Sequence, residues 1–167
     1  MHPAVRDFVS EIARRFEPRP PYALLEIGSL HVNGGIRDLW PGAEPYIGLD
    51  ISPGQGVDIV ADARSWIKDR NYNVVVATEV LEHVDNWEQV VHTAHEALAP
   101  GGLFVMTCAT TGRPPHGAHG SPEPLNGEYY SNVGLGEFAQ VVDELGFAEC
   151  ELRQTTGFDL QFYGFVA

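Results

Sequence analysis

The sequence has few cysteines, few basic residues and no long hydrophobic run. Cys108 and Cys150 both lie in apolar, strand-like segments, so we expect two buried free thiols rather than a disulfide or a metal site. No apolar run reaches the length of a membrane span, so we expect no membrane partner. Residues 1–17 mix charges throughout and lack the apolar core of a secretory signal, which predicts a cytoplasmic protein.

Positive charge is scarce: 10 Lys and Arg face 23 Asp and Glu, for a formal net charge of −13. The longest basic run is Arg14–Arg15. Nucleic acid is therefore a disfavoured partner, because affinity for phosphates depends on clustered basic residues. With 44% hydrophobic and 20% charged residues over 167 positions, the chain has the composition of a globular protein. We expect one domain over residues 1–167.

Hydrophobic periodicity predicts alternating helices and strands. An amphipathic stripe from Val5 to Phe16 predicts a first helix, and Pro18, Pro20 and Pro21 end it, so residues 1–21 form a helix and a linker. Strands are expected at 23–27, 46–50, 57–62, 73–77, 103–107, 147–155 and 158–166. Further helices are expected at 36–40, 63–70, 87–98 and 135–145.

Two helix boundaries carry specific signals. Asn86 and Gln89 stand in the capping-box arrangement at the start of the helix expected at 87–98. Gly146 is expected just beyond the end of the helix at 135–145. The order of elements predicts an α/β fold: a doubly wound, Rossmann-like, seven-stranded and mostly parallel sheet with helices on both faces. The short turn at Thr156–Gly157 makes the last strand antiparallel.

Residues 108–133 form a long connection without periodicity, which is usually a functional or mobile segment. We expect this loop and the N-terminal helix to wall the substrate side of a site. Tyr129, Tyr130 and Trp40 would then offer aromatic surface to a small acceptor. The alternative is that the two tyrosines anchor the loop on the core.

Four of the expected strands end at or beside an acid: Glu26, Asp50, Asp62 and Glu79. The carboxyl ends of parallel strands share one edge of a sheet, so these side chains would line one crevice. The turn from Gly28 to Gly34 would bring backbone N–H groups and a helix N-terminus close to a ligand. The pattern indicates a nucleotide-like ligand, although this turn alone is also compatible with an ordinary tight turn.

In this order and spacing, the motifs resemble those of class I S-adenosylmethionine-dependent methyltransferases of the small, minimal-fold type. Glu26-Ile27-Gly28 with Gly34 is similar to their first cofactor motif, and Asp50 to the acid that binds the ribose hydroxyls. Asp62-Ala63 resembles the pair that reads the adenine edge through a carboxylate and a backbone N–H. The segment from Thr78 to Val84 resembles the one that borders the sulfonium.

The resemblance implies S-adenosylmethionine as cofactor and S-adenosylhomocysteine as product. The cofactor-binding residues that it implies are Glu26, Gly28, Ser29, Asn33, Gly34, Asp50, Ile51, Asp62, Ala63, Thr78 and Glu79. The first turn departs from the family pattern because its middle glycine is replaced and Leu30 and His31 occupy the loop. The absence of Gly-x-Gly-x-x-Gly argues against a nicotinamide-dependent enzyme.

Methyl transfer from a sulfonium is an in-line displacement, so positioning supplies most of the catalysis. A hydroxyl acceptor also needs a base or a metal, and the candidate bases are His83, His116 and His119, each of which has a structural role as its alternative. Glu79-x-x-Glu82-His83 resembles the Mg²⁺-binding segment of ubiquinone-pathway O-methyltransferases and of small-RNA 2′-O-methyltransferases. His116 or His119 would complete such a metal site. The same segment is widespread where no metal is implied, so Mg²⁺ is not favoured and the metal ligands stay unknown.

The sequence therefore predicts a methyltransferase acting on an oxygen or nitrogen of a small molecule. Two alternatives stay open: a methyltransferase of RNA or protein, and a non-catalytic domain that binds the cofactor, or has lost it, and serves in assembly. The oligomeric state is also open, with a homodimer among the options.

Overall fold

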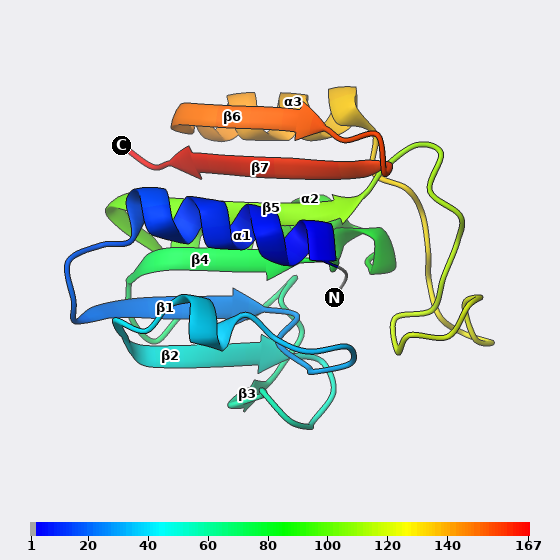
Figure 1. Cartoon of the computed structure of the whole chain (residues 1–167), viewed down its shortest axis with the longest axis horizontal. Coiled ribbons are helices and arrows are strands. Elements are labelled where there is room, and N and C mark those ends of the chain that lie inside the picture. The colour runs from blue at the N-terminus through cyan, green and yellow to red at the C-terminus, as the bar shows by residue number, and fades with distance from the viewer. Residues whose placement is uncertain (1–2) are drawn as a thin grey trace.

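The computed structural model describes residues 3–167 and builds them around one seven-stranded sheet (Figure 1). Its strands are β1 (Tyr22–Ile27), β2 (Ala43–Asp50), β3 (Ile59–Val60), β4 (Tyr72–Thr78), β5 (Leu98–Ala109), β6 (Ala148–Gln154) and β7 (Asp159–Phe165). The helices are α1 (Pro3–Phe16), α2 (Trp87–Ala97) and α3 (Leu135–Leu145), with 3₁₀ turns η1 (Arg37–Leu39) and η2 (Leu81–His83). Among the described residues, no helix is both long and apolar enough to cross a membrane.

The strand order is β3-β2-β1-β4-β5-β7-β6. Strands β1 to β5 run parallel to one another, and β7 lies between β5 and β6 and runs antiparallel to both. In the register of the central strands, Glu26 of β1 lies beside Gly48 of β2 and Val76 of β4. The expected Rossmann-like sheet is confirmed, and its carboxyl ends form one edge.

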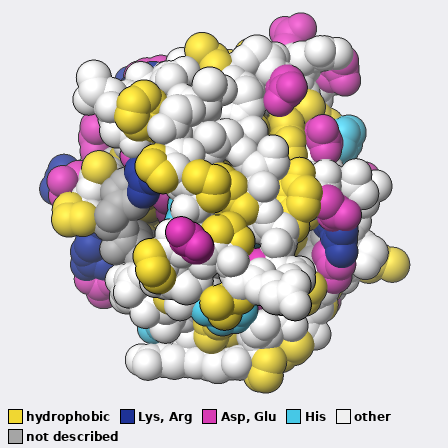
Figure 2. All heavy atoms as spheres, turned by 90° about the vertical axis from the view of Figure 1, so that its right-hand side faces the viewer, with side chains coloured by type: hydrophobic (Ala, Val, Ile, Leu, Met, Phe, Trp, Pro, Cys, Tyr) yellow, Lys and Arg dark blue, Asp and Glu magenta, His cyan; other side chains and the backbone are white. Residues whose placement is uncertain are grey.

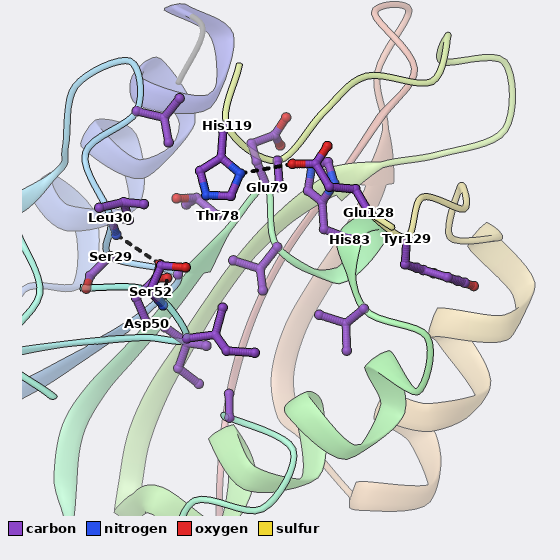
Figure 3. Close-up of a pocket in the computed structure, with 18 of the residues that line it drawn as sticks. Ser29, Leu30, Asp50, Ser52, Thr78, Glu79, His83, His119, Glu128 and Tyr129 are labelled. Carbon is purple, nitrogen blue, oxygen red and sulfur yellow. Dashed lines mark hydrogen bonds and ion pairs between the residues drawn. The ribbon is translucent and has the colours of Figure 1, made fainter. Parts of the chain in front are cut away.

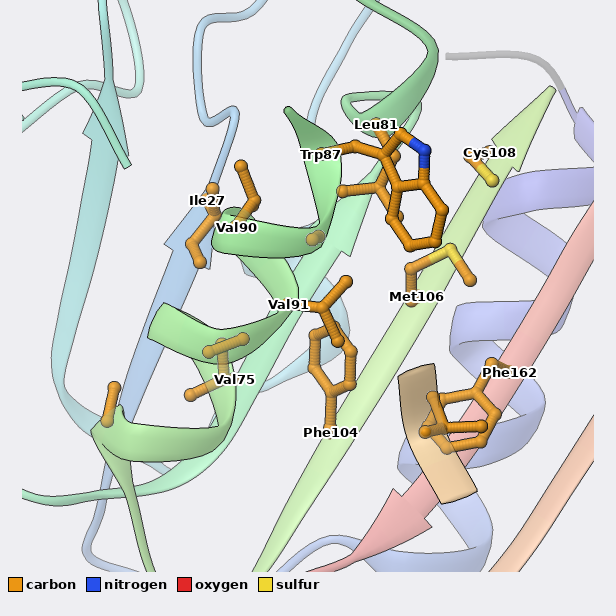
Figure 4. Packing of buried hydrophobic residues seen from close by; sticks show 14 of the residues in the cluster. Ile27, Val75, Leu81, Trp87, Val90, Val91, Phe104, Met106, Cys108 and Phe162 are labelled. Atoms are coloured by element: carbon orange, nitrogen blue, oxygen red, sulfur yellow. The ribbon is translucent and has the colours of Figure 1, made fainter. Parts of the chain in front are cut away.

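Helices cover both faces of the sheet. In Figure 1, α1 crosses the near face, while α2 and α3 lie behind it. The β-branched run of β4 explains why both faces can be covered: Val74 and Val76 pack with the α1 side, whereas Val75 packs with the α2 and α3 side. Figure 4 shows the second of these layers, with Val91 of α2 close above the sheet.

Several expected elements differ in the structure. No helix forms over 63–70, because the carboxylate of Asp62 accepts the backbone N–H of Arg64 and holds the chain in a turn. The helix expected at 36–40 shortens to η1, and the strand expected at 57–62 shortens to β3. Asn86 begins α2, but its side chain makes no capping hydrogen bond, so the capping box is not formed.

The two cysteines are both free, as expected, but only Cys108 is buried. Cys150 is exposed because β6 is the outer strand of the sheet, where most side chains are exposed. The expectation of two buried thiols was wrong for this residue. Gly146 does end α3, with a left-handed φ of 73°.

We expect Phe138→Ala to lower the free energy of unfolding by about 3–5 kcal/mol, because a large buried side chain is removed. Phe138 is fully buried, stacks on Trp87 at a ring-centroid distance of 5.9 Å, and meets Phe162 edge to face at 5.4 Å. The matched control is Leu135→Ala on the same helix, where the side chain is 41% exposed and the cost should stay below about 1 kcal/mol. Equal losses in urea titrations of the two variants would contradict this packing.

Candidate active site

A cavity of about 730 Å³ opens at the carboxyl ends of β1, β2 and β4 (Figure 3). Figure 2 looks onto this end of the molecule, where acidic side chains lie among hydrophobic ones near a histidine. The cavity falls in the size range of small-molecule and cofactor sites. All of the residues singled out above for cofactor binding, and all three candidate histidines, line it. The structure therefore brings the predicted site residues together.

The first turn leaves the cavity open despite its bulky residues. Gly28 has a φ of 76°, and a Cβ atom there would collide with the side chain of Val80, so only glycine fits this close approach. Leu30 lines the cavity, whereas His31 does not and instead packs beside Gly35 and Gly56. Replacement of the middle glycine thus does not block the hollow beside Gly28.

Asp50 ends β2 with its carboxylate fixed by two backbone groups. Its Oδ2 accepts the N–H of Leu30 at 3.0 Å, and its Oδ1 accepts the N–H of Ser52 at 2.9 Å (Figure 3). A carboxylate can accept about four hydrogen bonds, so both oxygens keep capacity for a ligand. This arrangement can accept hydrogen bonds from two adjacent hydroxyl groups.

Glu26 lies at the end of β1 and is only 2% exposed. The Tyr46 hydroxyl donates to its Oε2 at 2.7 Å, from the neighbouring strand β2. Burial raises the pKa of Glu26 from 4.5 to about 7, while the hydrogen bond from Tyr46 and the nearby charge of Arg37 act against that rise. A positively charged ligand group beside this carboxyl would favour its ionised form.

Asp62 follows β3 and is engaged by a neighbour that the sequence did not single out. Arg64 Nη2 donates to Asp62 Oδ2 at 2.7 Å, and Arg64 Nη1 also pairs with Asp85, which comes after η2. The hydrogen bond to Arg64 lowers the pKa of Asp62. All three residues line the cavity. The two-residue spacing from Asp62 is the one local signal for this contact.

Glu79 follows β4 with a φ of 56°, a left-handed conformation that non-glycine residues rarely adopt. The backbone N–H of Glu79 donates to the Thr107 carbonyl at 2.8 Å, and the Thr107 hydroxyl donates to Glu79 Oε1 at 2.9 Å. Two bonds from β5 thus hold this strained residue in place. Strain of this kind is concentrated at functional sites, and here the strained residue lines the cavity.

Glu82, His83 and His116 form a cluster next to Glu79, and one donor atom from each lies within 4.8 Å of the others. Glu82 is fully buried; its Oε1 accepts the N–H of Ala109 at 3.2 Å, but its Oε2 has no hydrogen-bond partner among the described residues. Burial first, and then the charge of Glu79, raise the pKa of Glu82 well above its ordinary value. The cluster holds a buried acceptor that its own surroundings do not satisfy.

Both histidines of this cluster present a free nitrogen. His83 is bonded to the backbone of Tyr129, yet its Nδ1 is buried without a partner in the described part of the chain. His116 Nδ1 lies 3.3 Å from the carbonyl oxygen of Pro114, which can only accept, so Nδ1 donates and Nε2 is left without a hydrogen-bond partner among the described residues. Burial, followed by the proximity of His116, lowers the pKa of His83.

His119 lies apart from that cluster, at the mouth of the cavity. Its Nδ1 is 2.9 Å from Glu128 Oε1, whose other oxygen accepts the N–H of Leu125 at 2.8 Å (Figure 3). Gly120 approaches Val32 of the first turn, so the loop reaches across the sheet edge and roofs the cavity.

The aromatic residues expected around the substrate divide into different roles. Tyr129 lines the cavity, but Tyr130 does not; its hydroxyl donates to Asn132 Oδ1 at 2.9 Å, and the Asn132 amide in turn donates to the Arg113 carbonyl at 3.0 Å, which joins the two ends of the loop. Trp40 is 1% exposed beneath α1 and does not reach the cavity, which corrects its expected place on the substrate side. No described residue of α1 lines this cavity either, so the N-terminal helix does not form the wall on the substrate side that was expected of it.

Comparisons with known proteins indicate the family to which this chain belongs. A family model described as "Methyltransferase domain" matches residues 4–118. A comparison with curated proteins found no match. Solved structures that resemble this one include the DhpI complex with S-adenosylhomocysteine, with 20% identity, a TM-score of 0.69, and 96% of this chain and 83% of that chain covered.

Two further structures share the fold. One is the 1,6-didemethyltoxoflavin-N1-methyltransferase of Burkholderia thailandensis, bound to its acceptor and S-adenosylhomocysteine, at 13% identity and a TM-score of 0.69, covering 98% and 79% of the two chains. The other is the CurJ carbon methyltransferase, at 18% identity and a TM-score of 0.66. The match covers 98% of this chain but only 53% of the CurJ chain, about half of its length.

The sheet order and the carboxylate-lined hollow at its edge are those of a Rossmann-like fold. The chain belongs to the methyltransferase domain family.

The raised pKa of Glu26 predicts a pH-dependent stability. The folded protein holds a proton that the unfolded chain releases between pH 4.5 and about 7, so this stabilisation is complete below pH 4.5 and lost as the pH approaches 7. Glu26→Gln should remove up to about 3 kcal/mol of that dependence and make the variant more stable than wild type at pH 8. Urea titrations between pH 5 and 8 measure this, with exposed Glu88→Gln as control. A Glu26→Gln profile parallel to that of wild type would contradict it.

Proposed function

We propose that this enzyme transfers a methyl group from S-adenosylmethionine to an oxygen or nitrogen atom of a small molecule, and that residues 1–167 act as one methyltransferase domain. The observation that carries the proposal is the convergence of four strand-end acids on one cavity, with a histidine-lined mouth beside them. The fold neighbour from Burkholderia thailandensis holds a small-molecule acceptor, which supports this acceptor class.

The cofactor positions follow from the carboxylates. The remaining acceptor capacity of Asp50 suits the two ribose hydroxyls, and Glu26 with the turn from Gly28 to Gly34 suits the ammonium and carboxylate of the methionine part. This places the sulfonium towards Thr78 and Glu79. The donated methyl group would then point towards His83 of η2 and His116 of the roofing loop.

Bound S-adenosylmethionine supplies the activated methyl group, so the protein has to align the acceptor and accept its proton. Among the predicted bases, His83 and His116 have free nitrogens next to Glu79, and the pKa of His83 is lowered, which favours the neutral imidazole that a base requires. His119 stands further out, paired with Glu128, and is better placed to hold the loop than to take a proton. The 108–133 loop would exclude water from the methyl group.

The same cluster fits a divalent cation. An unsatisfied buried oxygen of Glu82 and free nitrogens on His83 and His116 lie close together, and both histidines have their other nitrogen bonded to backbone. One carboxylate and two imidazoles suit Mn²⁺, Fe²⁺, Co²⁺ or Zn²⁺ better than Mg²⁺, which prefers oxygen ligands. A bound cation would polarise an acceptor oxygen and lower its pKa, so a hydroxyl acceptor is favoured if the site is loaded.

A macromolecular acceptor is the second candidate. The net charge of −13 disfavours RNA, and the two arginines that line the cavity in the described chain, Arg64 and Arg113, are already paired with carboxylates. Methylation assays with radiolabelled cofactor on a metabolite pool, an RNA pool and a protein pool distinguish a small-molecule acceptor from a macromolecular one. Labelling of the metabolite pool alone is expected, whereas labelling confined to RNA or protein would overturn the proposal.

The cofactor assignment predicts that Asp50→Ala weakens S-adenosylmethionine binding by roughly tenfold or more, because the ribose hydroxyls lose a charged acceptor. Isothermal titration calorimetry measures the affinity. Asp143→Asn, an exposed acid on α3, serves as the control and should leave it unchanged. Equal affinity in the Asp50 variant and the wild type would refute this placement of the ribose.

The metal assignment predicts that a chelator lowers activity and that Mn²⁺ restores it more effectively than Mg²⁺. His116→Ala should weaken Mn²⁺ binding by roughly tenfold or more in calorimetry, since a ligand is lost. Exposed His92→Ala on α2 is the matched control. Activity indifferent to chelation, together with no Mn²⁺ binding heat, would leave the histidines as bases without a metal.

A further inference from the structure

Arg64 bridges two carboxylates that come from different segments at the rim of the cavity. It pairs with Asp62, two residues earlier, through a contact of 2.7 Å, and with Asp85, which follows η2. These three residues all line the cavity. The bridge therefore crosses the end of the site where the motif resemblance puts the adenine of the cofactor.

The carboxylate of Asp62 has little capacity left for a ligand. Its Oδ1 accepts the backbone N–H of Arg64 at 2.9 Å and Nε at 3.1 Å, and its Oδ2 accepts Nε at 3.1 Å and Nη2 at 2.7 Å. Three N–H groups, one of which is shared between the two oxygens, thus occupy most of the roughly four acceptor positions that a carboxylate offers. The adenine amino group would meet a side chain that is already largely occupied, whereas Asp50 accepts one bond per oxygen.

The guanidinium of Arg64 is suited to a flat ligand. Two carboxylates hold it at both ends, so its plane is fixed, and it has more N–H groups than these contacts use. Such a group stacks on aromatic faces and can donate to ring nitrogens. The apolar side chains of Ile51, which is 68% exposed, and Val90 line the same cavity and offer a second surface for a ring.

We propose that Arg64 recognises the adenine base of the cofactor, and that Asp62 and Asp85 are positioning residues that act by holding its guanidinium. The inference rests on the proposed binding of an adenosyl cofactor. It changes the role that the family resemblance implies for Asp62, from reading the base directly to fixing the residue that reads it.

The test compares Arg64→Gln, Asp62→Asn and the double variant by calorimetry with S-adenosylhomocysteine. We expect Arg64→Gln to raise the Kd by roughly tenfold. Asp62→Asn alone should raise the Kd by a similar factor. Added to Arg64→Gln, it should raise the Kd by less than about threefold further, because the two substitutions remove the same interaction. Steady-state kinetics should show a higher KM for S-adenosylmethionine with kcat unchanged.

Controls separate a local effect from a folding defect. Arg70→Gln removes an exposed arginine that is also paired with the preceding acid, Asp69, outside the cavity, and should leave the Kd unchanged. Arg64→Lys keeps the charge but lacks the planar fork, so it should bind as weakly as Arg64→Gln. Thermal melting of each variant checks the fold.

Two results would overturn the inference. One is an unchanged or lower Kd in Arg64→Gln or in Arg64→Lys. The other is a further loss of threefold or more when Asp62→Asn is added to Arg64→Gln, since Asp62 would then meet the base itself. Absence of S-adenosylhomocysteine binding by the wild type would instead refute the proposed cofactor, which distinguishes the two failures.

Discussion

The structure depends on how five carboxylates are accommodated at one edge of a parallel sheet. Each is stabilised in a different way: Glu26 by protonation and the Tyr46 hydroxyl, and Asp50 by two backbone N–H groups. Asp62 is matched by an arginine and Glu79 by the hydroxyl of Thr107. Glu82 alone, among these five, keeps a buried oxygen without a hydrogen-bond partner in the described chain. This unsatisfied oxygen lies where the proposed function would use a cation or place the proton of the acceptor.

This distribution divides the cavity into two functional halves. The half near β1 and β2 is built from strand ends and short turns, which are rigid because backbone groups cross-link them, as Leu30 does with Asp50. The other half depends on the long loop, whose ends are held by the hydrogen bond from the Asn132 amide to the Arg113 carbonyl and by the ion pair of Arg113 with the buried Asp159. Under the proposed function, the half near β1 and β2 would hold the cofactor, and the half built by the loop would hold the acceptor and select it.

The sequence predicted what local pattern and parallel topology determine. The β-branched run of β4 indicated a strand buried on both faces, and the strand-end acids indicated a common edge; the structure confirms both. The helix expected over 63–70 failed because the side chain of Asp62 bonds the next turn of backbone, which helical periodicity does not reveal. Cys150 was misplaced because exposure on an edge strand follows from sheet order. The pairing of Arg64 with Asp85 and the choice of His116 over His119 beside His83 depend on loop paths, which have no periodic signal.

The central claim is that the strand-end acids enclose an adenosyl group. A crystal structure with S-adenosylhomocysteine tests it most directly. The account predicts both ribose hydroxyls within hydrogen-bonding distance of the Asp50 carboxylate, and the sulfur on the side of Glu79 that faces His83 and His116. A ligand bound outside this cavity, or one whose ribose lies away from Asp50, would contradict it.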